Sequence, residues 1–295
     1  MGLTSSLIRL ARPSQWIKNG FVLMPLVFSG RLFCPYDTVK TLGVFVSFCL
    51  AASATYAIND YMDMDQDRIH PLKRHRPLAS GAVSPNVALT FVAGLLAMMF
   101  LNSLLFKLPF FTIAVLVIYI VMHCLYSWGL KNLVIIDVLV ISTGFLLRIL
   151  AGTSALSVGV SSWLVLCTFS VAIFLALGKR RHEVMFLNGE AVSHRPVLEN
   201  YSVGFLDQLL QVVTTSTFIF YCLYSVKAGP GTDIQSEKMM LTIPFVTYGI
   251  FRYLYLIYHR EDGGSPTALL FTDPPLLVCV TLWLMACVYV IYWSV

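Results

Sequence analysis

Long apolar stretches separated by short polar segments are the feature that most constrains the fold of this chain. Nine of them approach the length of about 20 residues that a helix needs to cross a bilayer. They cover residues 17–34, 38–58, 85–106, 109–128, 133–152, 160–178, 208–226, 239–258 and 275–294. The first is short and contains Pro25, so we expect it to be tilted or broken. No stretch alternates like a strand, so we predict an all-α, polytopic membrane protein with about nine transmembrane helices.

The composition supports this prediction. Of the 295 residues, 58% are hydrophobic and only 12% are charged. Soluble domains carry about a quarter charged residues, so this chain cannot coat a water-soluble surface. A soluble enzyme, a nucleic-acid-binding module and a disordered chain are therefore all disfavoured.

The distribution of Lys and Arg predicts the orientation. Thirteen of these residues lie in or beside one set of loops: 1–16, 59–84, 129–132, 179–207 and 259–274. Five lie on the other side: Arg31, Lys40, Lys107, Lys227 and Lys238. Cytoplasmic loops are the ones enriched in Lys and Arg, so the first set and the N-terminus are expected to be cytoplasmic. The two long inner loops, 59–84 and 179–207, are expected to cap two four-helix halves.

An aspartate cluster at the inner end of the second span carries the strongest chemical signal. Asp60, Asp63 and Asp67 follow Asn59 at a spacing that places them on nearly one face of a helix. Asp65 points away from that face. Like charges this close require a cation, and Mg²⁺ is a hard cation that carboxylates and substrate phosphates hold together. The alternative is a solvated acidic loop shielded by nearby bases.

A basic segment follows at 70–81 and contains Lys73, Arg74 and Arg76. Bases next to a metal-binding acidic cluster are suited to a metal-bound anion, because they neutralise the charge that the metal leaves. The alternative is a plain topology signal. That signal would explain the number of bases but not their position beside the aspartates.

Two further groups of polar residues lie at or within the spans. Tyr126 and Lys131 stand at an inner membrane edge, where a tyrosine is often only an interface anchor. Asp137 and Arg148 fall inside the fifth span, where charges are costly and usually face a polar interior. A structural pair or a snorkelling arginine is the alternative for Arg148.

The inner end of the sixth span carries a third basic group. Lys179, Arg180 and Arg181 precede Glu183, and their position mirrors that of the aspartate cluster. We therefore predict that Lys179 and Arg180 form the opposite wall of one cavity. Arg181 lies about 100° further round the helix, so we expect it to face water or lipid headgroups.

Together these features resemble the UbiA superfamily of intramembrane prenyltransferases. The signature N-D-x-x-D-x-x-x-D is matched by Asn59, Asp60, Asp63 and Asp67, and Y-S-x-x-L-K is matched at 126–131. The resemblance implies one UbiA-like bundle over 1–295. It also implies a bound Mg²⁺ held by the four residues of the first signature. The catalytic residues it implies are Asp60, Asp63, Asp67, Tyr126 and Lys131.

One departure points to a particular branch of that superfamily. Its aromatic prenyltransferases carry a second aspartate-rich motif after the sixth span, where this chain has Lys179, Arg180 and Arg181. This basic segment, with the stretches 12–19 and 70–77, resembles the polyprenyl-phosphate phosphoribosyltransferase branch. A phosphoribosyl donor and a phosphorylated lipid bring three phosphate groups to the site, which suits one metal and an enlarged basic wall.

That branch implies the reaction and its partners. Phosphoribosyl diphosphate is the donor, a polyprenyl phosphate is the acceptor, and diphosphate leaves, in arabinan precursor synthesis at a bacterial-type inner membrane. No nucleic acid is expected to bind, and the oligomeric state is left open. The substrate-binding residues expected are Lys18, Asn59, Lys73, Arg74, Arg76, Asp137, Arg148, Lys179 and Arg180.

Two other functions remain as alternatives. An aromatic prenyltransferase would instead use a polyprenyl diphosphate donor, for a quinone or haem precursor. A secondary transporter would explain the intramembrane charges Asp137 and Arg148. It fits the aspartate cluster poorly, because transporter sites tend to lie near the bilayer midplane.

Overall fold

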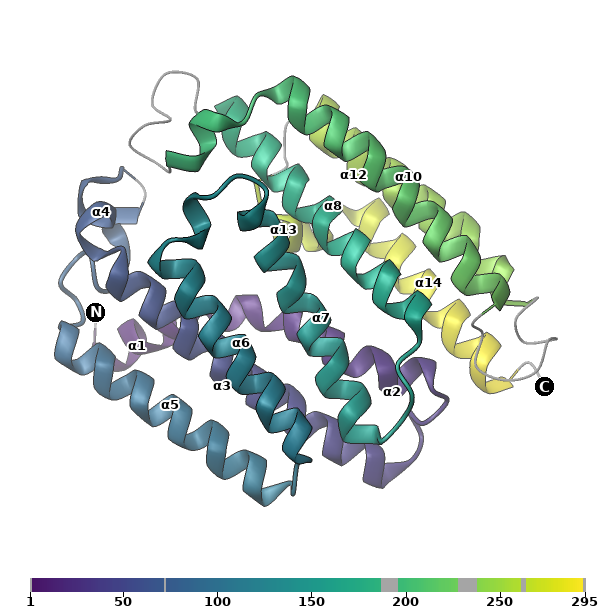
Figure 1. The fold of residues 1–295 in the computed structure, drawn as a ribbon, viewed down its shortest axis with the longest axis horizontal. Coiled ribbons are helices and arrows are strands. Elements are labelled where there is room, and N and C mark those ends of the chain that lie inside the picture. Colours follow the sequence, from purple (N-terminus) through teal and green to yellow (C-terminus); the bar gives the residue numbers. More distant parts are fainter. Residues whose placement is uncertain (1, 72, 187–195, 228–237, 261–263, 294–295) are drawn as a thin grey trace. The chain divides into compact units, whose positions relative to one another are not determined.

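The computed structural model describes residues 2–71, 73–186, 196–227, 238–260 and 264–293. Over these residues the chain is helical and contains no strand, which confirms the all-α prediction (Figure 1). Eight helices are long and apolar enough to cross a membrane. They are α3 (Pro35–Met62), α5 (Pro85–Leu105), α6 (Phe110–Trp128), α7 (Ile136–Leu156), α8 (Ser162–Phe186), α10 (Val203–Lys227), α12 (Ile243–His259) and α14 (Pro274–Trp293). The chain is a multi-pass membrane protein.

The first expected span, 17–34, is not a single helix. A 3₁₀ segment, η1 (Pro13–Leu23), is followed by the short α2 (Met24–Phe28). Pro25 has no backbone N–H to donate and its ring obstructs the preceding turn, so a regular helix cannot continue through it. The expectation of a broken segment is therefore confirmed, and eight of the nine stretches form single spanning helices within the described residues.

The chain divides into two compact units. The first contains residues 1–24, 34–140 and 147–158, and the second contains 25–33, 141–146 and 159–295. Helix α7 is shared, because its middle turns belong to the second unit and its ends to the first.

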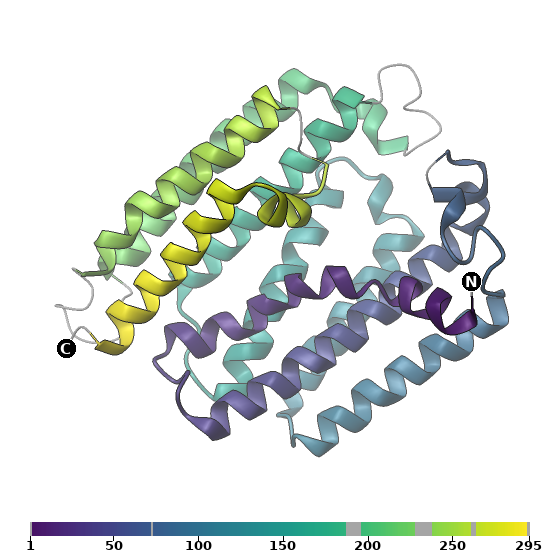
Figure 2. The same cartoon turned by 180° about the vertical axis from the view of Figure 1, so that it is seen from behind.

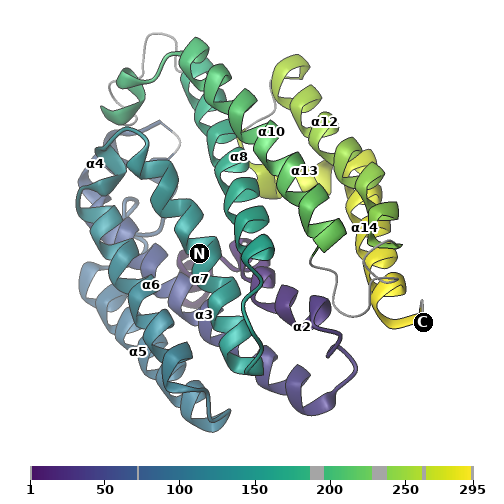
Figure 3. The ribbon, with the colours of Figure 1, turned by 45° about the vertical axis from the view of Figure 1, so that its right-hand side comes forward.

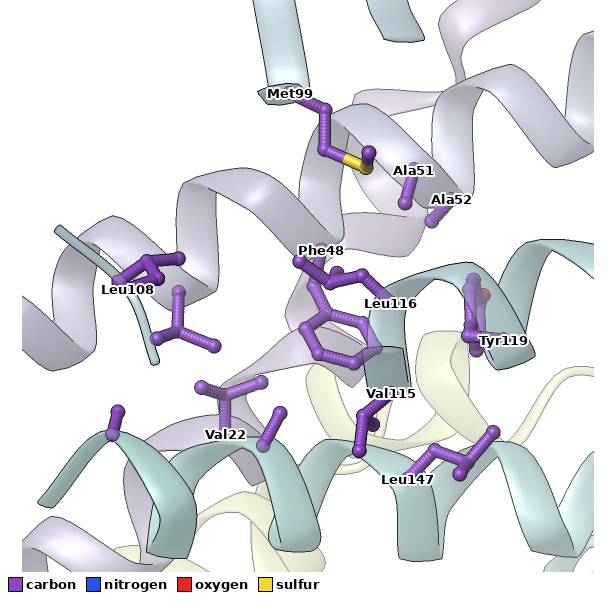
Figure 4. Packing of buried hydrophobic residues seen from close by; sticks show 13 residues of the cluster. Val22, Phe48, Ala51, Ala52, Met99, Leu108, Val115, Leu116, Tyr119 and Leu147 are labelled. Carbon is purple, nitrogen blue, oxygen red and sulfur yellow. The ribbon is translucent and has the colours of Figure 1, made fainter. Parts of the chain in front are cut away.

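The first unit is organised around α3. This helix packs against α5, α6 and η1, and Figure 2 shows η1 running along it, with α1 (Leu3–Ala11) at its end. Small residues on α3, such as Ala51 and Ala52, are buried and allow the close approach. The ring of Phe48 fills the centre of this core, among Val22, Leu116 and Tyr119 (Figure 4).

The second unit pairs α8 with α10 and α12 with α14, as Figure 3 shows. The short α13 (Pro266–Thr272) leads into α14. Residues 25–33 dock on the end of α14, where the Tyr292 hydroxyl accepts the Leu32 N–H at 2.8 Å and donates to the Val27 carbonyl at 3.0 Å.

The two expected cap loops differ in how much the structure describes. The segment 59–84 begins inside α3, continues through α4 (Met64–Ile69) and η2 (Lys73–His75), and is described apart from residue 72. Of the segment 179–207, residues 187–195 lie outside the described residues. The remaining elements are η3 (Leu130–Asn132), η4 (Pro196–Asn200) and η5 (Met240–Thr242).

Candidate active site

The aspartate cluster lies at the junction of α3 and α4 (Figure 1). Asp63 interrupts the expected regular helix, with φ −92° and ψ 3°. The helical hydrogen bonds nevertheless continue across it. The Asp63 N–H donates to the Asn59 carbonyl at 2.9 Å, and the Asp67 N–H donates to the Asp63 carbonyl at 2.8 Å. Asp65 points away, as expected: its side chain is 85% exposed and pairs with Arg68 at 2.9 Å.

Arg76 joins the two buried carboxylates of the cluster. Its Nη1 atom donates to Asp60 Oδ1 at 3.0 Å and to Asp67 Oδ2 at 2.7 Å. Asp60 is only 2% exposed, and its Oδ1 also accepts from Arg12 Nη2 at 2.5 Å. A carboxylate this buried requires charge partners, and two guanidinium groups supply them.

Arg12 is a site residue that sequence reasoning did not assign. It ends α1 in the left-handed region, with φ 50°, and this turn directs the chain into η1. The turn is tied to α3, because Ser53 Oγ donates to the Ala11 carbonyl at 2.8 Å and accepts from the Trp16 ring nitrogen at 3.0 Å. Two signals in the sequence pointed to it: Arg12 begins the stretch 12–19 that resembles the phosphoribosyltransferase branch, and the excess of aspartates at a membrane edge requires basic partners.

The two signature segments meet through Asp63. Lys131, in η3, forms an ion pair with Asp63 Oδ1. Asn59 Nδ2 donates to Asp63 Oδ2 at 3.1 Å, and Asn59 Oδ1 accepts from Ser127 Oγ at 3.0 Å. Asn59 therefore links α3 to the end of α6 and orients Asp63.

The other predicted bases near the cluster have different environments. Lys73 is half-buried, its backbone N–H donates to His70 Nδ1 at 3.2 Å, and its charge acts on Asp67. Burial raises the pKa of Asp67 above its usual value, while Arg76 and then Lys73 act to lower it. Arg74 is exposed, with its Nε 3.4 Å from the ring nitrogen of His75. Lys18 in η1 and Tyr126 in α6 are half-buried.

Arg148 lies in a buried polar group deeper in the first unit. Its Nε donates to Asn19 Oδ1 at 2.8 Å and its Nη2 to the Tyr119 hydroxyl at 3.0 Å. The guanidinium carbon is 5.0 Å from the centre of the Tyr119 ring and 5.8 Å from that of Phe48. Arg148 therefore faces the interior of the unit, and the alternative that its side chain snorkels to the membrane surface is wrong. Asn19 and Tyr119 were not predicted as partners of Arg148, because the three residues belong to η1, α6 and α7 and only tertiary packing brings them together.

Asp137 is fully buried in the first turn of α7. Eleven residues separate it from Arg148 along the same helix, which corresponds to about 16 Å of helical rise. It therefore occupies a different level of the unit.

The basic group of the second unit lies near the C-terminal end of α8. Lys179 and Arg180 both pair with Glu183, at 3.7 Å for the lysine. Arg180 is buried. Their role as the opposite wall of a cavity remains a prediction.

The expectation for Arg181 is wrong. Its side chain is buried, and its Nε donates to Asp207 Oδ1 at 2.6 Å. The guanidinium lies over the ring of Tyr258, 4.1 Å from its centre, and the Tyr258 hydroxyl donates to Asp207 at 2.9 Å. Helices α10 and α12 pack close enough to α8 at this point to cover the face that an isolated helix would turn to water.

The donor chemistry of the cluster fits a hard divalent cation. No three His, Cys, Asp or Glu side chains of the described residues are arranged as a ready-made metal site. One cationic atom, Arg76 Nη1, nevertheless contacts both Asp60 and Asp67. A position shared by two carboxylates is what Mg²⁺ commonly uses, since substrate phosphates and water complete its coordination.

Comparison with known families gives an independent result. The family model described as "UbiA prenyltransferase family" matches residues 23–273. The chain belongs to this family. The match includes the aspartate cluster, Lys131 and the basic group of α8.

Two curated relatives cover nearly the whole chain. A decaprenyl-phosphate phosphoribosyltransferase of Mycolicibacterium smegmatis is 34% identical, over 99% of this chain and 94% of the relative. The protein of the same name from Corynebacterium glutamicum is 31% identical, over 98% and 88%. Among solved structures, a UbiA homologue from Archaeoglobus fulgidus bound to GPP and Mg²⁺ is similar with a TM-score of 0.72 and 19% identity, over 98% of this chain and all of that one. The last comparison supports the fold alone.

Proposed function

We propose that this protein is a membrane transferase that moves 5-phosphoribose from phosphoribosyl diphosphate to a polyprenyl phosphate and releases diphosphate. The full-length similarity to two decaprenyl-phosphate phosphoribosyltransferases carries the proposal. The basic residues near the end of α8 also support it. Among the described residues of this helix end, Glu183 is the one acid, and it already pairs with Lys179 and Arg180.

The aspartate site is proposed to hold the diphosphate of the donor. Asp60 and Asp67 would hold Mg²⁺, with Asp63 and the oxygen of Asn59 as the further ligands that the family signature implies. When bound, the metal would withdraw charge from the leaving diphosphate. Arg12, Arg76 and Lys73 surround these carboxylates and can donate to phosphate oxygens.

The chain's own residues would then act mainly by positioning. The bond from the sugar C1 to the diphosphate oxygen breaks, and a phosphate oxygen of the acceptor lipid forms the new bond at C1. A phosphate monoester is already an anion, so the acceptor needs no strong base. Lys131 and Asn59 hold Asp63, and fixed charges around the leaving group lower the barrier without reorganising.

We also propose that this site faces the cytoplasm. The bases that surround the cluster lie in the loops with the excess of Lys and Arg, which are usually retained on the cytoplasmic side. A water-soluble donor is then available at the membrane edge, and an apolar acceptor is available within the bilayer.

Purified protein with Mg²⁺, phosphoribosyl diphosphate and decaprenyl phosphate tests the proposal. Mass analysis of the lipid should show the addition of one phosphoribosyl group and an equimolar release of diphosphate. A parallel reaction with a polyprenyl diphosphate and an aromatic acid tests the aromatic prenyltransferase alternative. Prenylation of the aromatic compound, with no modified lipid phosphate, would reject the proposal.

A further inference from the structure

One nitrogen of the Arg76 guanidinium contacts both buried carboxylates of the cluster, Asp60 and Asp67. Arg76 Nη1 is 3.0 Å from Asp60 Oδ1 and 2.7 Å from Asp67 Oδ2. A divalent ion shared by the same two carboxylates would compete for those oxygens, since both cations need their lone pairs. Arg76 and a bridging metal therefore cannot use these oxygens together in this arrangement.

We infer that Arg76 is an internal substitute for the metal in the substrate-free enzyme, and that it transfers from the carboxylates to a donor phosphate when the metal binds. A guanidinium binds carboxylate and phosphate with the same planar, multiply donating geometry, so the exchange preserves its charge-assisted hydrogen bonds. The inference deepens the proposed function, because it concerns how the same site binds its metal and donor.

The surroundings of Arg76 favour such an exchange. Its side chain is about one quarter exposed, whereas Asp60 and Asp67 are almost completely buried. The side chain of Arg76 therefore has solvent access that the two carboxylates lack, and an incoming phosphate can approach it without uncovering the aspartates. Arg12 remains on Asp60 Oδ1 from the side of α1, so the carboxylate keeps one charge partner while Arg76 moves.

The exchange makes binding of the metal and binding of the donor depend on each other. The metal alone should bind weakly, because it must displace Arg76 without giving the guanidinium a new partner. A diphosphate provides that partner, so metal and donor should each increase the affinity for the other by the same factor. Removing the guanidinium should therefore strengthen binding of the metal alone and abolish the coupling.

Mn²⁺ binding, followed by electron paramagnetic resonance on purified protein in detergent, tests this without any turnover. Arg76→Gln should bind Mn²⁺ about tenfold more tightly than the wild type when no phosphate is present. This factor corresponds to about 1.4 kcal/mol, the cost of displacing the competing cation. Phosphoribosyl diphosphate, or inorganic diphosphate as a second probe, should tighten Mn²⁺ binding at least fivefold in the wild type but less than twofold in Arg76→Gln.

Arg68→Gln is the matched control. It removes the same charge from the same segment, but Arg68 pairs with the exposed Asp65 and not with the cluster. Its Mn²⁺ affinity and coupling should equal those of the wild type, and Arg76→Lys should keep the weak metal binding. If Arg76→Gln does not fold, Arg76→Met replaces it, and the loss of the guanidinium should tighten Mn²⁺ binding by the same factor.

The outcomes separate the two proposals. Equal or weaker Mn²⁺ binding in Arg76→Gln, or in Arg76→Met where that variant replaces it, with Arg68→Gln unchanged, would overturn the exchange even if phosphoribosyl transfer is observed. Coupling to inorganic diphosphate but not to phosphoribosyl diphosphate would support the exchange and reject the proposed donor. A wild type that binds Mn²⁺ tightly without any phosphate would also overturn the exchange.

Discussion

At the scale of single residues, Asp60 is the point on which the charges of the site converge. Its carboxylate is buried and contacts two guanidinium groups, so both its charge and its position are defined by neighbours. Asp65, five residues along, has the same chemistry but points into solvent. Comparing substitutions of Asp60 and Asp65 therefore tests the role of the cluster within one segment.

Asp60→Asn should lower phosphoribosyl transfer by at least about 100-fold, which corresponds to about 3 kcal/mol of lost transition-state stabilisation. The variant loses a metal ligand and leaves Arg12 and Arg76 competing for a neutral amide. Asp65→Asn should stay within about twofold of the wild type. Initial rates at saturating Mg²⁺ check both, and equal losses in the two variants would contradict the metal assignment.

Arg181 has a structural role, because it joins α8 to Asp207 of α10 and to Tyr258 of α12. Arg181→Ala removes the ion pair with Asp207 and the stacking on Tyr258, at a cost of about 2 kcal/mol for a partly exposed pair. The midpoint of thermal unfolding should fall by roughly 5 °C. Lys179→Ala, which removes a more exposed and longer ion pair, should shift it by less than about 2 °C. An unchanged midpoint in Arg181→Ala would show that the interhelical contact contributes little.

At the scale of elements, a glycine on α3 allows the close approach of Phe106, the residue that caps the end of α5. A Cβ atom at Gly43 would lie 2.5 Å from Cγ of Phe106, the rigid base of that ring. The Gly43 carbonyl also accepts from Asn102 Nδ2 at 2.8 Å, which holds the two helices in register. Gly94, on α5, has nothing within 4 Å of such a Cβ.

Gly43→Ala should therefore destabilise the protein by about 1–3 kcal/mol, since a methyl group there overpacks the contact. Gly94→Ala should be neutral or slightly stabilising, because alanine is the better helix former. Thermal unfolding in the same detergent compares them. A smaller loss in Gly43→Ala than in Gly94→Ala would mean that α3 and α5 are further apart than described.

We expect Asp273 to stabilise the start of α14 in a pH-dependent way. Hydrogen bonds from Arg252 hold the pKa of Asp273 below its usual value, and its Oδ1 also accepts from the Leu276 N–H at 2.9 Å. A carboxylate with a lowered pKa contributes stability above its unfolded pKa, near 3.9, and loses it as the pH falls through the folded value. Asp273→Asn should thus unfold at a lower temperature than the wild type at pH 7. The difference should shrink below about pH 4, and a difference independent of pH would contradict this role.

The elements also show what the sequence can and cannot predict. The spans and the aspartate cluster were predictable because hydropathy and residue spacing are local properties. The partnership of Arg12 with Asp60 was not, because it spans 48 positions and depends on one left-handed residue that turns the chain back along α3. The burial of Arg181 was likewise decided by α10 and α12, which no property of its own helix reveals.

At the scale of the whole molecule, the order of the chain and its packing do not coincide. Residues 25–33 belong to the second unit although they follow η1 of the first, and α7 contributes turns to both. The two four-helix halves expected from loop lengths are therefore only approximate, since neither unit is a continuous half of the chain. Such crossings arise from tertiary contacts, and hydropathy carries no information about them.

The proposed sidedness can be tested through a natural cysteine. Cys34 is exposed at the start of α3, whereas the other cysteines are buried or half-buried within the long helices. Twenty-six residues separate it from Asp60 along α3, a helical rise of about 39 Å, which exceeds the hydrocarbon thickness of about 30 Å. Cys34 and the aspartate cluster must therefore lie at opposite faces of the membrane.

A membrane-impermeant maleimide should consequently label Cys34 in intact spheroplasts, and Cys34→Ser should abolish that labelling. In the Cys34→Ser background, Arg74→Cys places a thiol at an exposed position beside the cluster, and it should react only in inverted vesicles. The two thiols should show opposite accessibility, because the spanning helix α3 lies between them in the chain. Labelling of Cys34 only in inverted vesicles would place the active site outside the cell. A cytoplasmic phosphoribosyl donor could then not reach it, and the proposed reaction would fail on topology even with the chemistry intact.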